Sequence, residues 1–160
     1  MEVVKQIIDL GELFYIANDV NDIRQSFIKA TGQENGFRGT SFSVDEVLDD
    51  VTDIAFKYSQ FLLKGADNSF LEIKLVNEGL NRVANHLRVR IGQQNIKVAF
   101  AKIAYIANVL RSKDKSPLIK TVNMSSLNKT SFTGKYKVLE RLKVINPEAY
   151  FYCAMAVGTK

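Results

Sequence analysis

Two stretches of the chain repeat their apolar residues at the period of an α-helix, and this repeat restricts the fold more than any other feature. The first seam runs through residues 47–62 and the second through residues 73–87. Apolar residues that recur every three or four positions line one face of a helix with 3.6 residues per turn. The two seams are Val47, Val51, Ile54, Tyr58 and Leu62, and Ile73, Val76, Leu80, Val83 and Leu87.

The same helix-start signal precedes both seams. Ser43 and Glu46 precede the first, and Ser69 and Glu72 precede the second. This spacing is that of a capping box, in which each side chain accepts a hydrogen bond from the backbone N–H of the other residue. Gly65 is suited to end the first helix, because glycine readily adopts the left-handed conformation that closes a helix.

Helical spacing continues on the N-terminal side of these seams. Residues 3–14 and 20–27 predict two helices that are separated at Asn18 and Asp19, with Asp19 as an N-cap. The polar stretch from Gly32 to Phe42 predicts the first loop.

The C-terminal half predicts three further helices. Asn95 is placed to cap a helix that runs to about Arg111 and is apolar nearly all round, which is typical of a central, buried helix. Residues 118–124 could form a short strand, but their alternation is poor and we expect no sheet; residues 136–144 look helical. Asn146, Pro147 and Glu148 predict an N-cap, a first-position proline and a first-turn acid that open a last helix. We therefore expect an all-α fold, a single domain over residues 1–160 with about six helices around the central helix at residues 95–111.

The composition excludes several classes of protein. The only cysteine, Cys153, allows no internal disulfide framework, and with one histidine the chain offers no zinc constellation. Cys153 lies in an apolar segment, where we expect a buried structural thiol. The most apolar run, residues 96–110, is too short to span a bilayer and contains Lys97 and Lys102. Charges near the start interrupt any secretory signal, so we expect a cytoplasmic protein with no membrane contact.

The charges are sorted along the chain. Residues 1–80 carry a net charge of −7, and residues 81–160 carry a net charge of +12. Acids near a helix start have a structural cause, because they complement the helix dipole. The basic excess has no such local cause and suggests an anionic partner. Its members in the C-terminal half are Arg88, Arg90, Lys97, Lys102, Arg111, Lys113, Lys115, Lys120, Lys129, Lys135, Lys137, Arg141 and Lys143.

Two other outcomes of this charge sorting stay open. The fold could bring the acidic third helix onto the basic residues and cancel much of the field within one molecule. Acidic and basic surfaces of different copies could also pair, which would give a homo-oligomer that dissociates as salt rises.

The polar side of the fourth predicted helix is a candidate binding face. Glu78, Arg82 and His86 follow one another at i, i+4 and i+8, and Asn77, Asn81 and Asn85 run beside them. Asparagine is a poor helix former, so recognition of a partner by amides and a guanidinium is one reason for its presence. The competing interpretation is a solvated face with an ordinary Glu78–Arg82 pair.

No motif in the chain predicts catalysis or a cofactor. Thr133, Gly134 and Lys135 do not complete a phosphate-binding loop, because Lys129 stands where the motif needs its first glycine. Asp45, Asp49 and Asp53 are stacked at i, i+4 and i+8 and could hold a hard cation, but a solvated helix face explains them better. We therefore expect no metal, no cofactor and no catalytic residue.

Three segments carry a resemblance to a known family. The run Gly39 to Asp50, the apolar helix Ile96 to Arg111 and the segment Leu142 to Tyr152 resemble helical regions of the abortive-infection nucleotidyltransferase toxin group of bacterial proteins. The chain lacks that family's catalytic glycine-rich turn and paired acidic metal ligands. The resemblance thus implies a helical part of a toxin-antitoxin-like system without the catalytic part.

Together these features predict a non-enzymatic helical interaction module. Its basic C-terminal half would bind an anionic partner, either a nucleic acid or an acidic protein surface. An alternative is a small enzyme or toxin-system effector that uses the polar face of the fourth helix. The binding residues that we expect are Asn77, Asn81, Arg82, Asn85, His86, Lys129, Lys135, Lys137 and Arg141.

Overall fold

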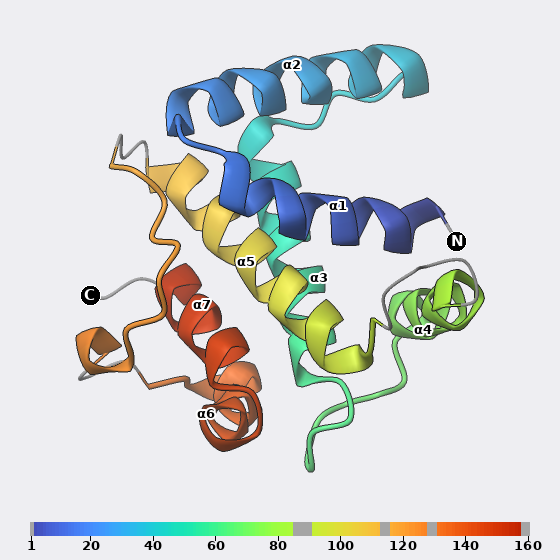
Figure 1. Cartoon of the computed structure of the whole chain (residues 1–160). Helices are drawn as coiled ribbons and strands as arrows, with labels where there is room; N and C mark the ends of the chain where they lie inside the picture. Colours follow the sequence, from blue (N-terminus) through green and yellow to red (C-terminus); the bar gives the residue numbers. More distant parts are fainter. Residues whose placement is uncertain (1, 85–90, 113–115, 128–130, 158–160) are drawn as a thin grey trace.

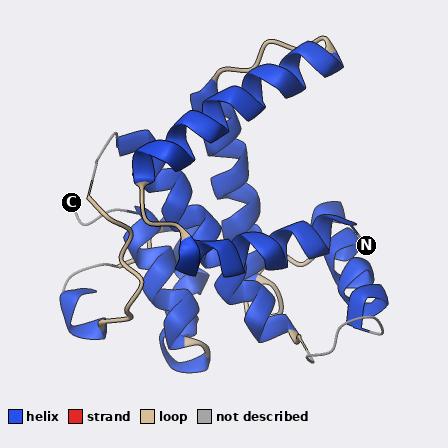
Figure 2. Cartoon of the chain, turned by 45° about the horizontal axis from the view of Figure 1, so that its top comes forward, coloured by secondary structure: helices blue, strands red, loops and turns tan. Residues whose placement is uncertain are grey.

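A computed structural model describes residues 2–84, 91–112, 116–127 and 131–157, and every regular element in these ranges is a helix (Figures 1 and 2). The described residues form seven α-helices and two 3-10 helices, so the predicted all-α class is confirmed. The elements are α1 (Glu2–Ile16), α2 (Val20–Arg38), α3 (Val44–Gln60), α4 (Leu71–Ala84), α5 (Gln93–Ser112), η1 (Met124–Leu127), η2 (Gly134–Arg141), α6 (Leu142–Ile145) and α7 (Pro147–Val157).

Helix α5 lies at the centre, as the sequence predicts, and packs against α1, α3 and α7 (Figure 1). Ile96, Ala101 and Ala104 are completely buried along it. Its small residues let neighbouring helices approach closely. A Cβ atom at Gly11 of α1 would lie only 3.2 Å from Cβ of Ala99, so α1 crosses α5 where both side chains are minimal.

Two lysines of this central helix are also buried, so they do not belong to a basic surface. Lys97 Nζ donates a hydrogen bond to the carbonyl oxygen of Phe61, at a distance of 2.6 Å. Phe61 is the residue that follows α3, so a cation sits at the negative end of that helix dipole. Lys102 pairs with Glu148 of α7.

Three of the predicted helix starts are confirmed. Asp19 caps α2 by accepting hydrogen bonds from the backbone N–H groups of Asn21 and Asp22. Ser43 and Glu46 form the complete capping box of α3. Asn146 Oδ1 accepts from the backbone N–H of Ala149 at 3.1 Å, and Pro147 takes the first position of α7.

The predicted loop from Gly32 to Phe42 is wrong over most of its length, because α2 continues to Arg38. Gly32 and Gly36 lie on open surface and interrupt no hydrogen bond of the helix. The helix ends where Gly39 adopts φ +66° and donates its N–H to the carbonyl oxygen of Asn35. A left-handed glycine at that position is a common helix stop.

Other boundaries also differ from the sequence prediction. Helix α3 ends at Gln60 rather than near Gly65, and Lys97 and Asn68 hold the following turn through hydrogen bonds at Phe61 and Leu62. Helix α4 begins at Leu71, two residues after Ser69 rather than directly after it, and the N–H and hydroxyl of Ser69 both donate to Asp67.

The C-terminal segments show similar differences. Helix α5 begins at Gln93, and Asn95 accepts from the N–H of Gly92 instead of capping the helix itself. The described part of 118–124 contains no strand, and 136–144 is mostly 3-10 helix.

Candidate functional site

A cleft of about 720 Å³ lies between the first five helices. Pockets that hold ligands or partner side chains are mostly apolar, with volumes of roughly 300–1,000 Å³. The cleft matches this description, because sixteen of its nineteen lining residues are apolar or glycine. They are Val4, Ile7 and Leu10 of α1, Ile23 and Phe27 of α2, Leu48, Val51 and Ile54 of α3, Leu75, Val76 and Gly79 of α4, and Phe100, Ile103, Ile106, Ala107 and Leu110 of α5.

The cleft has a buried floor and exposed lips. Val4, Leu48 and Phe100 form part of the floor and are almost completely buried. Leu10 of α1 and Leu75 of α4 line the same cleft, yet they are 46% and 57% exposed. Apolar surface therefore continues from the core to the solvent without a polar covering.

The arrangement of the helices explains why this space stays open. Helix α2 packs on α3 and α5, whereas α4 packs on α1 and α3. Figures 1 and 2 both show α2 and α4 well apart, with α1 and α3 reaching between them. The cleft lies in the space between α2 and α4, and residues of α5 line its inner side.

The charged lining residues, Glu72, Glu78 and Arg82, all belong to α4. All three are exposed, and none has an ion-pair partner within the described ranges. The residues that α1, α2, α3 and α5 contribute to the lining are thus apolar, and the charged border of the cleft lies on α4.

The residues of the predicted binding face of α4 have different surroundings in the structure. Asn77 is half-buried, and its amide is occupied, because Oδ1 accepts from the Tyr58 hydroxyl and Nδ2 donates to the carbonyl oxygen of Ile73. Its hydrogen bond to Tyr58 joins α3 to α4. Asn81 and Arg82 are exposed, and Arg82 lies at the cleft. Asn85 and His86 lie outside the described residues.

The predicted basic residues Lys135, Lys137 and Arg141 are all exposed on η2. Lys135 also forms an ion pair with Asp53 at 2.8 Å. Lys129 lies outside the described residues. Lys143 of α6 is a further exposed cation beside η2, and its ammonium group lies over the Tyr150 ring.

The acidic helix α3 is partly neutralised within the molecule, as one of the alternatives above proposed. Arg111 of α5 pairs with Asp49 at 2.6 Å, and Lys57 and Lys135 both pair with Asp53 at 2.8 Å. Partial burial opposes ionisation of Asp53, but hydrogen bonds from the two lysines outweigh it and lower the pKa of that carboxyl to about 2. Within the described ranges, no three acidic, histidine or cysteine side chains are grouped to hold a metal ion.

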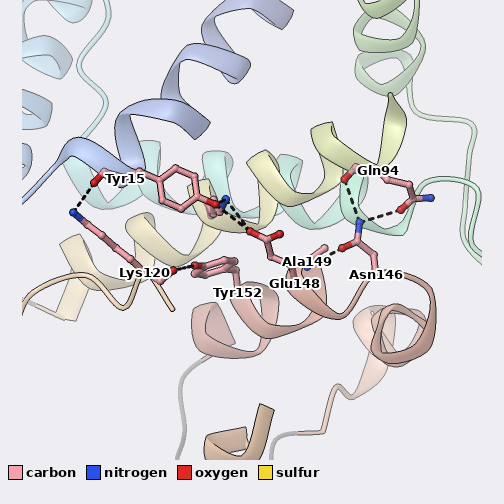
Figure 3. Close-up of polar contacts among 8 residues, drawn as sticks. Tyr15, Gln94, Lys120, Asn146, Glu148, Ala149 and Tyr152 are labelled. Atoms are coloured by element: carbon pink, nitrogen blue, oxygen red, sulfur yellow. Dashed lines mark hydrogen bonds and ion pairs between the residues drawn. The ribbon is translucent and has the colours of Figure 1, made fainter. Parts of the chain in front are cut away.

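A polar cluster links α1, α5 and α7 on the other side of the molecule (Figure 3). Lys102 Nζ lies 2.9 Å from Glu148 Oε1 and also donates to the Tyr15 hydroxyl. Lys120 Nζ donates to the carbonyl oxygen of Tyr15, and the Tyr152 hydroxyl donates to the carbonyl oxygen of Lys120. Every member is hydrogen-bonded to another protein group, so the cluster serves to join these helices.

Cys153 is completely buried in α7. Burial raises the pKa of its thiol to about 12, so the thiol stays protonated in neutral solution. This matches the expected structural thiol, because the reactive form of cysteine is the thiolate.

No protein-family model, curated protein or solved structure matches this chain. The resemblance to the nucleotidyltransferase toxin group therefore stays a prediction. None of the helices in the described part of the chain is long and apolar enough to cross a membrane.

Sequence reasoning found the helices that line the cleft but missed the cleft itself. Val51, Ile54 and Val76 belong to the seams that predict core-facing positions. One signal was present in the pattern: Leu75 is a large apolar residue beside the second seam, and Leu10 is a large apolar residue of the predicted helix over residues 3–14. Their exposure depends on how far apart the helices stand, which periodicity does not fix.

Proposed function

We propose that this protein is a non-enzymatic helical interaction module, and that the cleft between α1, α2, α3, α4 and α5 receives the apolar face of a partner protein segment. The observation that carries the proposal is the continuous apolar lining with the exposed lips Leu10 and Leu75. Contiguous exposed apolar surface with a polar border is typical of interaction sites.

The energetics favour such a partner. Removing apolar surface from water stabilises a complex by about 25 cal/mol per Å². Both lips remain in water in the free protein, so they contribute this free energy only when a partner covers them. Ionisable groups at the cleft are limited to Glu72, Glu78 and Arg82 in the described ranges, which is the sparse polar border of a binding groove.

Binding of a synthetic amphipathic helix with a leucine stripe and neutral glutamine flanks tests the proposal. Leu10→Glu and Leu75→Glu should each weaken binding about tenfold or more, because each places a charge against the apolar face. Leu13→Glu and Leu71→Glu are matched controls, since both leucines are exposed on the same two helices but do not line the cleft. Equal losses in the lip and control variants would overturn the proposal.

A second candidate function is binding of an anionic partner through the basic segment of η2 and α6. Lys137, Arg141 and Lys143 are exposed in this short segment and have no acidic ion-pair partner in the described ranges. Cations clustered in this way attract phosphate groups by counterion release.

A salt titration of nucleic-acid binding tests this second candidate. Replacing Lys137 and Arg141 with glutamine should reduce the slope of log affinity against log salt by about one for each lost phosphate contact. Lys5→Gln with Lys64→Gln removes the same charge from exposed positions elsewhere and serves as the control. Negligible binding at low salt would overturn this candidate.

A further inference from the structure

We infer that the segment bound in the cleft is an amphipathic α-helix with lysine or arginine residues beside its apolar stripe. This inference rests on the proposed function and specifies its partner. It follows from two features of the cleft: its exposed apolar lips, and two carboxylates on α4 that form no salt bridge in the described ranges.

The lips favour a helix over a small apolar molecule. A ligand enclosed near the floor, around Leu48 and Phe100, would leave Leu10 and Leu75 in water. A helix that lies along a groove instead inserts apolar residues at i, i+3 or i+4, and i+7. The residues on either side of this apolar stripe cover the border of the groove. An occupant of this kind can remove both lips from solvent.

The charges on α4 favour a basic helix. Glu72 and Glu78 line the cleft and form no salt bridge in the described ranges, although Lys57 of α3 attracts Glu72 from a greater distance. Arg82 is the only cation among the described lining residues. A carboxylate headgroup or an acidic helix would face two like charges there. Basic side chains on the partner would instead pair with both carboxylates, and the complex would shield those pairs from water.

The spacing of the two carboxylates matches a helical partner. Glu72 and Glu78 are six residues apart, which is about 9 Å along a helix axis. Basic residues seven positions apart on a partner helix are separated by about 10 Å. Six residues also turn a helix by about 120°, so Glu72 and Glu78 lie in different directions around α4. A partner helix that lies along α4 can meet both carboxylates when it carries basic residues on both sides of its apolar stripe.

The test compares two synthetic helical peptides of about 16 residues that share one leucine stripe. One carries lysine at the flanking positions and the other carries glutamate. The lysine peptide should bind about tenfold more tightly at low salt, and the difference should shrink as salt rises. The double variant Glu72→Gln with Glu78→Gln should remove most of the preference. Glu12→Gln with Glu34→Gln is the matched control, because both acids are exposed and lie outside the cleft lining.

The outcomes separate this inference from the proposed function. Equal binding of both peptides, weakened by Leu75→Glu, would overturn the basic helix and leave the cleft as a binding site. Tighter binding of the glutamate peptide would also overturn the basic helix. Binding of palmitate that Leu75→Glu abolishes, with no peptide bound, would show a lipid in the cleft and overturn both proposals. No binding of either peptide or of palmitate would overturn the proposed function itself.

Discussion

Lys102 Nζ lies 2.9 Å from Glu148 Oε1, and this contact joins the central helix α5 to the last helix α7. The two partners are buried to very different extents: the lysine side chain is 5% exposed and the glutamate side chain is 40% exposed. Rings of Phe14, Tyr15 and Tyr152 stand within 4.2–5.5 Å of the ammonium group. A cation in this apolar setting depends on its carboxylate more than the carboxylate depends on it.

The first prediction follows from this asymmetry. Glu148→Gln should reduce the free energy of unfolding by about 1–3 kcal/mol, because it leaves a buried ammonium group without its counter-charge. Lys102→Met should be less damaging, since water can solvate the exposed carboxylate that remains. Urea denaturation followed by circular dichroism measures both effects. A larger loss in Lys102→Met than in Glu148→Gln would contradict the asymmetry.

The second prediction concerns the close crossing of α1 and α5. Gly11→Val should lower the free energy of unfolding by about 1–3 kcal/mol, because even a Cβ atom at this position meets Ala99 at 3.2 Å. Gly36→Ala on α2 is the matched control. It has open space around it, so the helix propensity of alanine should stabilise the protein by up to about 1 kcal/mol. Opposite signs for the two variants in thermal unfolding would support the crossing, and equal signs would contradict it.

Helix positions were predictable from this sequence wherever a local signal was sufficient. Ser43 with Glu46, Asp19, and Asn146 with Pro147 all mark helix starts that the structure confirms. Local signals failed where a distant residue decides the boundary. Lys97 of α5 fixes the turn after α3, and no pattern within that turn indicates this.

The candidate site was less predictable than the fold. The excess of basic residues in the C-terminal half of the sequence suggested a basic surface. Lys97 and Lys102 are buried, however, and Arg111 and Lys135 form ion pairs with acids of α3. A helical period shows which face of a helix is apolar but not whether a neighbour covers it. The cleft arises from the separation of α2 and α4, which is a property of the packed molecule.

The third prediction concerns acid stability. The folded-state pKa of Asp53 is about 2, below the value of about 3.9 for an aspartate in an unfolded chain. The stability that its two lysine contacts provide is therefore present above pH 4 and is lost as the pH falls toward 2. The stability difference between the wild type and Asp53→Asn should shrink over that window. Urea titrations at each pH measure this difference, and a difference that stays constant from about pH 5 to pH 2 would contradict the prediction.

The fourth prediction concerns alkaline stability and Lys97. Burial lowers the pKa of this ammonium group below its unfolded value of about 10.4. The unfolded chain binds more protons between the two pKa values, so this residue's contribution to stability rises with pH across that window. The stability of the wild type relative to Lys97→Met should therefore increase with pH up to about 10.4. A constant difference across alkaline pH would show that Lys97 does not titrate differently on folding.

The last prediction distinguishes the lips of the cleft from its floor. Leu75→Gln should change the free energy of unfolding by less than about 0.5 kcal/mol, because the leucine is already 57% exposed in the free protein. Leu48→Ala should reduce it by about 2–5 kcal/mol, since Leu48 is buried beneath the same cleft. Leu75→Gln should nevertheless weaken peptide binding, although it leaves the free energy of unfolding almost unchanged. A large loss of stability in Leu75→Gln would mean that this lip is packed within the protein, and the cleft would then be closed to a partner.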